Sequence, residues 1–406
     1  MAFQVNSDLA LADLRELATF GACGQGVERR MWTPADVQSR RWLQRKMAEA
    51  GLEAHIDAVG NVVGRTNHKR RVVIGSHTDT VPKGGWLDGA LGVITGLAIA
   101  RALQTQKPDL PIGVEVVSFA DEEGYFAPFL GSKVAAGFIT VKAALTTKNS
   151  LGETLAACIQ GSELATQNAW RIDPSHHVAF LELHIEQGPV LDAHQIALGV
   201  VTHIVGIRQD RVTFVGSANH AGTTPMNMRA DAAAALFDFA TEWRRQCAAM
   251  GSPTAVWNVG HAILEPNAHN VVASRALGTC QYRDIEEETL QRCGLLLRES
   301  AEAAARRNQC SWSIERQLEI QPTPMSPGLV DICERACRTL GHSFRRMPSG
   351  AGHDAMIIGR VIPAGMLFVP SKGGISHSTD EDTPAESLAR GMQALASAFE
   401  QVSRLQ

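Results

Sequence analysis

The chain has 406 residues, of which 45% are hydrophobic and 20% charged, so it has an ordinary globular composition and enough length for two domains. A net charge of −4 excludes the basic footprint that is typical of nucleic-acid-binding proteins. Residues 1–21 lack the pattern of a secretion signal, and no apolar run approaches the ~20 residues of a membrane span. The eight cysteines form no CxxC pair, so we expect free thiols and a cytoplasmic protein with no nucleic-acid or membrane partner.

The first half of the chain has the pattern of an α/β domain. Apolar spacing predicts helices over residues 8–20, 36–50 and 91–103. Three short apolar runs predict buried strands over residues 71–75, 112–120 and 178–183, and polar side chains follow directly after each run. Because α/β sheets bind ligands at the carboxyl ends of their strands, we expect these polar side chains to meet.

The pattern changes near residue 206. In chain order it predicts a strand over 210–216, a helix over 229–250, strands over 255–264 and 277–283, a helix over 285–307 and a strand over 312–319. This β-α-β-β-α-β order resembles a small ferredoxin-like domain, and Pro322 and Pro324 mark its end. We therefore predict a catalytic domain of residues 1–205 and 322–406 with a domain of residues 206–321 inserted into it.

Several short segments carry side chains that are typical of metal-dependent chemistry. They are GSHTDTVP from residue 75 with GGWLDG from residue 84, DEEG from 121, HIEQGP from 184, NHAGTTPM from 219 and GGISHS from 373. Each segment alone is a weak signal, because a histidine at a strand end is more often structural and an acidic run is usually solvated. Three of them directly follow predicted strands, and histidine with carboxylate suits borderline divalent cations, so together they indicate a metal site.

In order and context these segments resemble the M20 metallopeptidase superfamily. The most similar branch is the hydantoinase/carbamoylase family of N-carbamoyl-L-amino acid hydrolases, allantoate amidohydrolases and β-ureidopropionases. HTDTVPKGGWLDGALGV, FADEEG and ANHAGTTPM carry the resemblance, which covers nearly the whole chain. It implies an α/β, mixed-sheet, di-zinc aminopeptidase-like catalytic domain with an inserted ferredoxin-like α+β lid. It also implies a homodimer that forms through the inserted domain, and two divalent ions per subunit, either zinc or manganese, cobalt or nickel.

The resemblance also implies the roles at the metal centre. The ligands would be His77, Asp88, Glu123, His184 and His377, with Asp88 between the two ions. Glu122 would take a proton from the attacking water and pass it to the leaving nitrogen. Asp79 would share one side of an extended segment with His77, which makes its carboxylate a candidate acceptor for the second ring N–H of His77.

The resemblance places most substrate contacts in the inserted domain. His220 would stabilise the tetrahedral oxyanion, and Asn270 and Arg283 would bind the carboxylate of the substrate. In the catalytic domain, Gln187 and the backbone near Gly352 are further expected contacts.

One departure from the family pattern concerns substrate identity. Many relatives carry glutamine where this chain has Ile207, so either Gln209 takes over that contact or the substrate differs.

The leading hypothesis is hydrolysis of an N-carbamoyl-L-amino acid to the amino acid, carbon dioxide and ammonia. The alternatives with the same chemistry are allantoate and N-carbamoyl-β-alanine. An aminoacylase or peptidase is disfavoured because His184 stands where peptidase relatives place a carboxylate. A catalytically inactive binding protein would lack a ligand or the base, and this chain has all six side chains.

Overall fold

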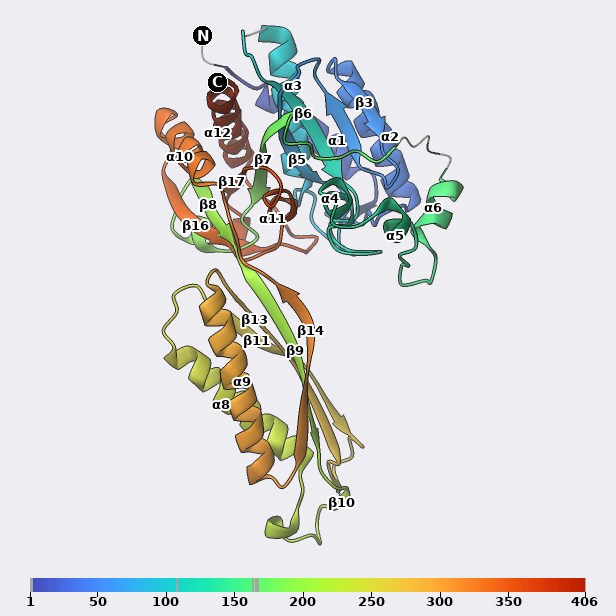
Figure 1. Cartoon of the computed structure of the whole chain (residues 1–406), viewed down its shortest axis with the longest axis vertical. Coiled ribbons are helices and arrows are strands. Elements are labelled where there is room, and N and C mark those ends of the chain that lie inside the picture. The colour runs from blue at the N-terminus through green and yellow to red at the C-terminus, as the bar shows by residue number, and fades with distance from the viewer. Residues whose placement is uncertain (1–2, 107–108, 163, 165–167, 406) are drawn as a thin grey trace. The chain divides into compact units, whose positions relative to one another are not determined.

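The computed structural model describes residues 3–106, 109–162, 164 and 168–405, which form two compact units (Figure 1). Unit 1 comprises Met1–Thr202 and Pro324–Gln406, and unit 2 comprises His203–Thr323. The borders expected from the sequence, at residues 205/206 and 321/322, lie close to these. The large mixed sheet of unit 1 and the helices around it confirm the expected mixed α/β fold.

Unit 1 is built on a nine-stranded mixed sheet with the order β15-β8-β17-β7-β5-β6-β4-β3, in which β16 also pairs with β8. The strands are Glu53–Ile56 (β3), Val62–Arg65 (β4), Arg71–His77 (β5), Gly113–Phe119 (β6), His177–Ile185 (β7), Leu198–Ile204 (β8), Thr323–Pro324 (β15), Phe344–Ser349 (β16) and Ala364–Val369 (β17). β17, β7, β5 and β6 pair in parallel, so their carboxyl ends lie along one edge of the sheet.

Helices and short turns complete unit 1. They are Ser7–Ala18 (α1), Pro34–Glu49 (α2), Ala90–Gln106 (α3), Leu130–Ala135 (α4), Val141–Leu145 (α5), Leu155–Gly161 (α6), Val190–Ala193 (α7), Pro327–Thr339 (α10), Asp354–Ile358 (α11), Ala385–Ser403 (α12) and the 3-10 turn Lys372–Gly374 (η2), with the hairpin Ala22–Cys23 (β1) and Gly26–Val27 (β2). α3 packs on β5, β6 and β7. A Cβ at Gly92 of α3 would lie 2.8 Å from the carbonyl oxygen of Leu183, so glycine lets the helix approach the sheet closely.

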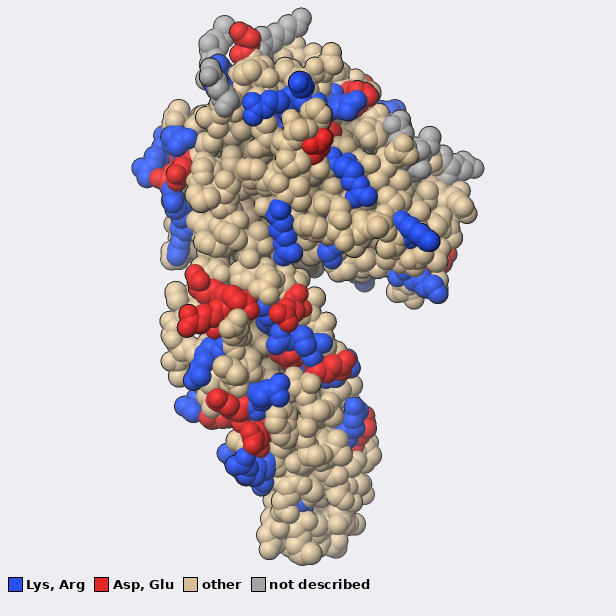
Figure 2. Space-filling view, in the orientation of Figure 1, with Lys and Arg blue, Asp and Glu red and all other residues tan. Residues whose placement is uncertain are grey.

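Unit 2 is a four-stranded antiparallel sheet with two helices. Its elements are Gly206–Val215 (β9), Asn219–His220 (β10), Met226–Met228 (η1), Ala232–Ala249 (α8), Val256–Glu265 (β11), Val271–Val272 (β12), Arg275–Asp284 (β13), Glu287–Arg307 (α9) and Ser311–Ile320 (β14). The sheet order is β11-β13-β9-β14, and both helices pack against it. Along β9 the buried Val212 and Phe214 alternate with the less buried Gln209 and Thr213, as in a sheet with one covered face. Acidic and basic side chains are mixed along the exposed side of α9 (Figure 2).

The predicted helix over residues 229–250 begins only at Ala232. The Asp231 carboxylate accepts hydrogen bonds from the backbone N–H groups of Ala233 and Ala234 and so caps the helix there. The residues before it form η1 and an extended segment. The predicted strand over 210–216 shifts in the opposite direction, because it begins earlier than expected, at Gly206.

Among the described helices, none has both the length and the apolarity that a membrane span requires.

Three of the parallel strands are joined near their amino ends by one buried carboxylate. Glu115 of β6 accepts hydrogen bonds from Arg71 Nε (2.7 Å) and Trp170 Nε1 (2.8 Å), and its Oε2 lies 3.0 Å from His177 Nε2. Burial acts to raise the pKa of Glu115, but the contacts with His177 and Arg71 outweigh it and lower that pKa to about 2. Arg71 begins β5 and His177 begins β7, so this network sets how the central strands lie side by side.

We predict that Glu115→Gln lowers the free energy of unfolding by roughly 3 kcal/mol or more at pH 7, because it leaves Arg71 without its charged partner inside the protein. The folded-state pKa is depressed, so the stabilisation by Glu115 is complete above the ordinary value of 4.5 and disappears as the pH falls towards about 2. Urea unfolding of both proteins at several pH values measures this. Glu53→Gln is the control: Glu53 pairs with Arg65 on the surface, and its loss should cost less than about 1 kcal/mol. Equal losses for the two variants would contradict the prediction.

Candidate metal centre

The carboxyl ends of β5, β6 and β7 bring the predicted ligands together. His77 is the last residue of β5, and His184 stands next to the end of β7. Glu122 and Glu123 follow β6, and Asp88 lies two residues before the start of α3. Because the three strands are parallel neighbours, residues far apart in the sequence meet at one edge of the sheet.

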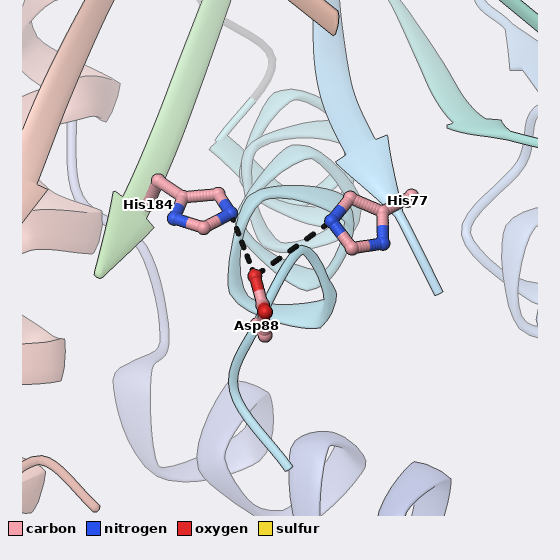
Figure 3. Close-up of side chains that lie close together, drawn as sticks. All are labelled: His77, Asp88 and His184. Carbon is pink, nitrogen blue, oxygen red and sulfur yellow. Dashed lines mark ion pairs between the residues drawn. The ribbon is translucent and has the colours of Figure 1, made fainter. Parts of the chain in front are cut away.

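The first group of candidate ligands is His77, Asp88 and His184. Asp88 Oδ1 lies 3.1 Å from His184 Nε2 and 3.7 Å from His77 Nε2, and Figure 3 shows one imidazole ring on either side of the carboxylate. All three side chains are buried. Their ligand atoms lie within 4.8 Å of one another, which is a spacing that one cation can fill.

The second group is Asp88, Glu123 and His377, whose ligand atoms also lie within 4.8 Å of one another. Asp88 uses its other oxygen here: Oδ2 lies 3.1 Å from His377 Nε2, and Glu123 Oε1 lies 3.6 Å from the same nitrogen. His377 comes from the loop that follows η2, in a left-handed backbone conformation with φ 52°. A single carboxylate therefore faces two groups of ligands, one with each oxygen.

The state of the histidine rings fits metal coordination. His77 Nδ1 lies 3.0 Å from the carbonyl oxygen of Asp79, and His184 Nδ1 lies 2.9 Å from that of Ile185. A carbonyl only accepts, so each Nδ1 carries a proton, and in the neutral form that binds a cation each ring would offer the lone pair of Nε2. The backbone N–H of Gly89 donates to His184 Nε2 at 3.2 Å, in agreement with this tautomer.

The carboxylates of the centre also fit metal coordination. Glu123 Oε1 is buried and has no hydrogen-bond partner among the described residues. Burial, together with the nearby charge of Asp88, raises the pKa of Glu123 to about 8. Burial also acts on Asp88, but its contacts with His184 and His377 outweigh it and hold the pKa of Asp88 well below its usual range. A cation between such groups would supply the charge that an unpaired buried carboxylate requires.

The expected role of Asp79 is corrected by the structure. Its carboxylate does not accept the ring N–H of His77, because Oδ1 lies 3.9 Å from Nδ1 while the backbone oxygen of Asp79 takes that position. β5 ends at His77, so the two-residue repeat of a strand does not extend to residue 79. The carboxylate instead accepts the backbone N–H groups of Glu122 (3.4 Å) and Glu123 (3.1 Å) and orients that pair.

Glu122 and Glu123 point in different directions from adjacent positions. Glu122 Oε2 lies 3.7 Å from His77 Nε2, whereas Glu123 reaches towards His377. Burial raises the pKa of Glu122 well above its ordinary value, and the charge of Glu123 adds to this. The preceding Asp121 has φ 56° and accepts three backbone N–H groups from residues 125–127, which fixes the turn that presents the pair.

Two supporting residues carry no signal in a single sequence. Glu381 Oε1 accepts the backbone N–H groups of Leu87 and Asp88, both at 3.1 Å, and so holds the segment that presents Asp88. Gly89 has φ 66°, and a Cβ there would lie 2.4 Å from the His77 ring, so only glycine fits beside this ligand.

Gln187 is also brought to the centre. Its Nε2 lies 3.1 Å from Asp88 Oδ2 and 3.3 Å from His377 Nε2, beside the second group of ligands. Gly352 lies in the loop that joins β16 to α11, one residue before His353, whose ring centroid lies 4.5 Å from that of His184. A Cβ at Gly352 would lie 2.8 Å from the Phe129 ring.

The other expected substrate contacts belong to unit 2. Arg283 of β13 is the register partner of Ile207 on β9, and its Nε and Nη2 donate to Gln281 Oε1 at 3.0 and 2.7 Å. Gln209 lies two residues beyond Ile207 on the same strand, and its Oε1 accepts a hydrogen bond from Gln281 Nε2 at 3.0 Å. Asn270 binds the loop of His220, because its carbonyl oxygen accepts the backbone N–H of Ala221 at 3.0 Å.

Comparison with known proteins places this fold and site in a class of hydrolases. Residues 73–401 match the family model of Peptidase family M20/M25/M40, and the chain belongs to this family.

Within that family the chain is similar to amidohydrolases. It is 33% identical over 395 residues to the N-carbamoyl-L-amino-acid amidohydrolase of Paenarthrobacter aurescens, covering 94% of this chain and 95% of the relative. It is 34% identical over 387 residues to the allantoate amidohydrolase of Escherichia coli (strain K12), covering 94% of each. Its structure matches that of an amidase of the hydantoinase/carbamoylase family from Burkholderia phymatum with a TM-score of 0.92 and 38% identity over 98% of both chains. The resemblance inferred from the motifs is confirmed, and so is the class of enzyme, a hydrolase that acts on non-peptide C–N bonds.

We predict that Asp88→Ala removes most bound divalent metal, because both groups lose the carboxylate that they share. Protein dialysed against zinc or manganese and assayed by elemental analysis should hold two ions per wild-type chain and fewer than one per Asp88→Ala chain. Asp380→Ala, which removes an exposed carboxylate close to His377 in sequence, should retain both ions. An Asp88→Ala protein that holds two full equivalents would contradict the shared position.

Proposed function

We propose that this chain hydrolyses the carbamoyl C–N bond of N-carbamoyl-L-amino acids to give the amino acid, carbon dioxide and ammonia at a centre of two divalent cations. The observation that carries the proposal is the Asp88 carboxylate, which faces His77 and His184 with one oxygen and His377 with the other. The amidohydrolase relatives support this chemistry.

His77, Asp88 and His184 would hold one cation, and Asp88, Glu123 and His377 the other. Such a pair of bound ions lowers the pKa of water and polarises the carbonyl that is attacked. Histidine with carboxylate accepts zinc and also manganese, cobalt or nickel, and availability often decides among them.

Glu122 is the proposed general base. It is buried beside His77 and precedes the proposed ligand Glu123 in the sequence. Its carboxylate would not bind a cation, so Oε2 would receive a proton from the attacking water and later give it to the leaving nitrogen. The Asp79 carboxylate holds the backbone of Glu122 and keeps its side chain on that side of the centre.

Arg283 and Asn270 are the proposed partners of the substrate carboxylate, with His220 as the donor to the oxyanion. Gln281 holds the guanidinium of Arg283 through Nε and Nη2, which pre-orients it. The backbone near Gly352 is a further proposed contact of the carboxylate. Gln187, at the edge of the second group of ligands, is placed to meet the carbamoyl group.

Allantoate is the second candidate substrate. The relative from Escherichia coli is named for it, and allantoate and carbamoyl amino acids both present a carboxylate near a ureido carbon. Ile207 is the register partner of Arg283, and its side chain has no amide that could hydrogen-bond a second polar group of the substrate. N-carbamoyl-β-alanine presents the same functional groups with one more carbon between them.

The experiment that tests the proposal is a substrate panel. Ammonia release is measured with carbamoyl-L-amino acids, allantoate and N-carbamoyl-β-alanine, and acetate release with N-acetyl-amino acids, each with zinc, manganese, cobalt and nickel. We expect the highest kcat/KM for a carbamoyl-L-amino acid. A preference for allantoate would replace the substrate and keep the chemistry, whereas hydrolysis of acetyl-amino acids alone would overturn both.

We predict that Glu122→Gln retains two metal ions but lowers kcat by roughly two to four orders of magnitude, because the amide cannot take up the proton. Steady-state kinetics and elemental analysis on the same preparation separate the two effects. Glu53→Gln, the surface variant used above, should leave kcat unchanged. Wild-type turnover by Glu122→Gln would remove Glu122 from this role.

A homodimer through unit 2 is part of the proposal. β11 is an edge strand, and its Val256 and Ile263 are 56% and 43% exposed. α8 packs against β11, and its Phe237 is 57% exposed. Exposed apolar side chains beside an unpaired strand edge suit pairing with a second copy.

We predict that Phe237→Glu reduces the sedimentation coefficient from that of a dimer to that of a monomer, because it places a charge in this contact. Leu295→Glu is the matched control, since Leu295 is 53% exposed on the other helix of unit 2. A wild-type chain that sediments as a monomer would contradict the proposal.

A cytoplasmic location is proposed as well, and all eight cysteines support it because they are free thiols.

A further inference from the structure

A loop of unit 2 fixes the histidine that we propose as the oxyanion donor. His220 belongs to the two-residue strand β10, which pairs antiparallel with β12 through His220 and Val271. The next residue, Ala221, donates its backbone N–H to the carbonyl oxygen of Asn270. The chain then turns back on itself, because Thr224 donates both its N–H (3.1 Å) and its hydroxyl (2.8 Å) to the carbonyl oxygen of His220.

The turn determines which nitrogen of His220 carries the proton. The backbone N–H groups of Gly222 and Thr223 both donate to His220 Nδ1, at 3.0 and 3.1 Å. A ring nitrogen that accepts hydrogen bonds cannot carry the proton of a neutral imidazole, so that proton is on Nε2. The ring is exposed, and it presents an N–H donor at the far side from the turn.

Glycine at position 222 is part of the same arrangement. A Cβ there would lie 3.2 Å from His220 Cε1 and 3.5 Å from Nδ1, closer than most such contacts. The absence of a side chain lets the ring lie against the backbone that binds it.

Arg229 closes the turn from its other side. Its Nε donates to the carbonyl oxygen of Thr224 at 3.0 Å, and its Nη2 donates to that of Ala221. These two carbonyls flank Gly222 and Thr223, whose N–H groups bind His220. The forked guanidinium therefore spans the segment that sets the tautomer, which a single ammonium could not do.

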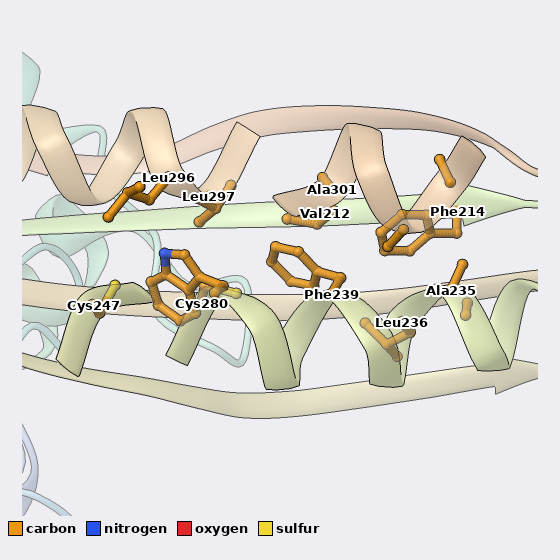
Figure 4. Close-up of a cluster of buried hydrophobic side chains, with 14 of the residues drawn as sticks. Val212, Phe214, Ala235, Leu236, Phe239, Cys247, Cys280, Leu296, Leu297 and Ala301 are labelled. Carbon is orange, nitrogen blue, oxygen red and sulfur yellow. The ribbon is translucent and has the colours of Figure 1, made fainter. Parts of the chain in front are cut away.

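The base of the loop is attached to the core of unit 2. Asp231 caps α8, Ser217 N–H donates to the carbonyl of Ala230, and Ala232 N–H donates to that of Ala273. α8 in turn buries Leu236 and Phe239 against the sheet, next to Phe214 (Figure 4). Arg229 thus lies between a rigid helix start and the turn that carries His220.

We propose that Arg229 is a positioning residue, which holds the turn of residues 221–224 so that His220 keeps its proton on Nε2 and offers it as a hydrogen-bond donor. This inference rests on the proposed function for the catalytic role of His220, but the tautomer itself does not depend on it.

The test compares Arg229→Ala and Arg229→Lys with Arg275→Ala. Arg275 is the matched control because it is another arginine of unit 2, paired with Glu265 on the surface. Each chain is prepared with its metal ions and assayed for kcat, KM and thermal unfolding. The His220 nitrogens are observed by NMR in protein labelled with ¹⁵N-histidine and assigned from their loss in His220→Gln.

We expect wild-type His220 to show a protonated Nε2 and an unprotonated Nδ1. Arg229→Ala and Arg229→Lys should shift these two resonances towards each other and lower kcat about tenfold or more, with KM changed less than about twofold, because an oxyanion donor acts in the transition state. Added guanidinium should restore part of the activity of Arg229→Ala, and Arg275→Ala should behave as wild type.

A wild-type His220 protonated at Nδ1 would overturn the inference. So would Arg229 variants with wild-type kcat and unchanged His220 resonances, and so would an equal loss of kcat in Arg275→Ala. If the wild-type chain hydrolyses none of the ureido substrates, the proposed function fails while the NMR comparison still decides the tautomer. Arg229→Lys keeps the comparison decisive if Arg229→Ala does not fold.

Discussion

The arrangement of the candidate centre depends on the burial of one carboxylate, that of Asp88, among three histidines. Each of its oxygens faces a separate group of ligands, so a displacement of this side chain would change both groups together. Its position is fixed from several directions: Glu381 holds the backbone of residues 87 and 88, and α3 starts two residues after Asp88. Gly89 lets the His77 ring lie against the same turn.

The surrounding acidic side chains explain why this edge of the sheet suits cations. Asp79, Glu122 and Glu123 lie near Asp88, and burial raises the pKa of each of these three carboxyls. Backbone carbonyls hold the protons of His77 and His184 on Nδ1, which leaves Nε2 of each ring directed at Asp88. Negative charge and free lone pairs are therefore gathered where two positive ions would balance them.

In unit 2, too, backbone groups set the position of a histidine proton, although none of the proposed metal ligands lies there. The backbone of a turn, rather than a second side chain, sets the proton of His220, and Arg229 holds that turn by its carbonyls. Gln281 likewise holds Arg283 on the open face of its sheet. In both units the side chains proposed to act on substrate are oriented by neighbours that would not touch it, which limits the reorganisation that binding requires.

The sequence by itself determined the class of the protein. Apolar runs followed by SHTD, DEEG and HIEQ predicted buried strands of an α/β sheet that end in polar chemistry, and the motifs identified the family, because strand burial and strand-end position are local properties of the chain. It did not determine the partners of those side chains. The Asp79 carboxylate was expected to bind His77 and instead binds the backbone of Glu122 and Glu123, because β5 ends at His77 and its two-residue repeat does not reach residue 79. Glu381 holds Asp88 from 293 residues away, and the pairing of β10 with β12 holds the base of the turn that places the proton of His220. Such contacts follow from the path of the chain in three dimensions, and only the tertiary structure decided them.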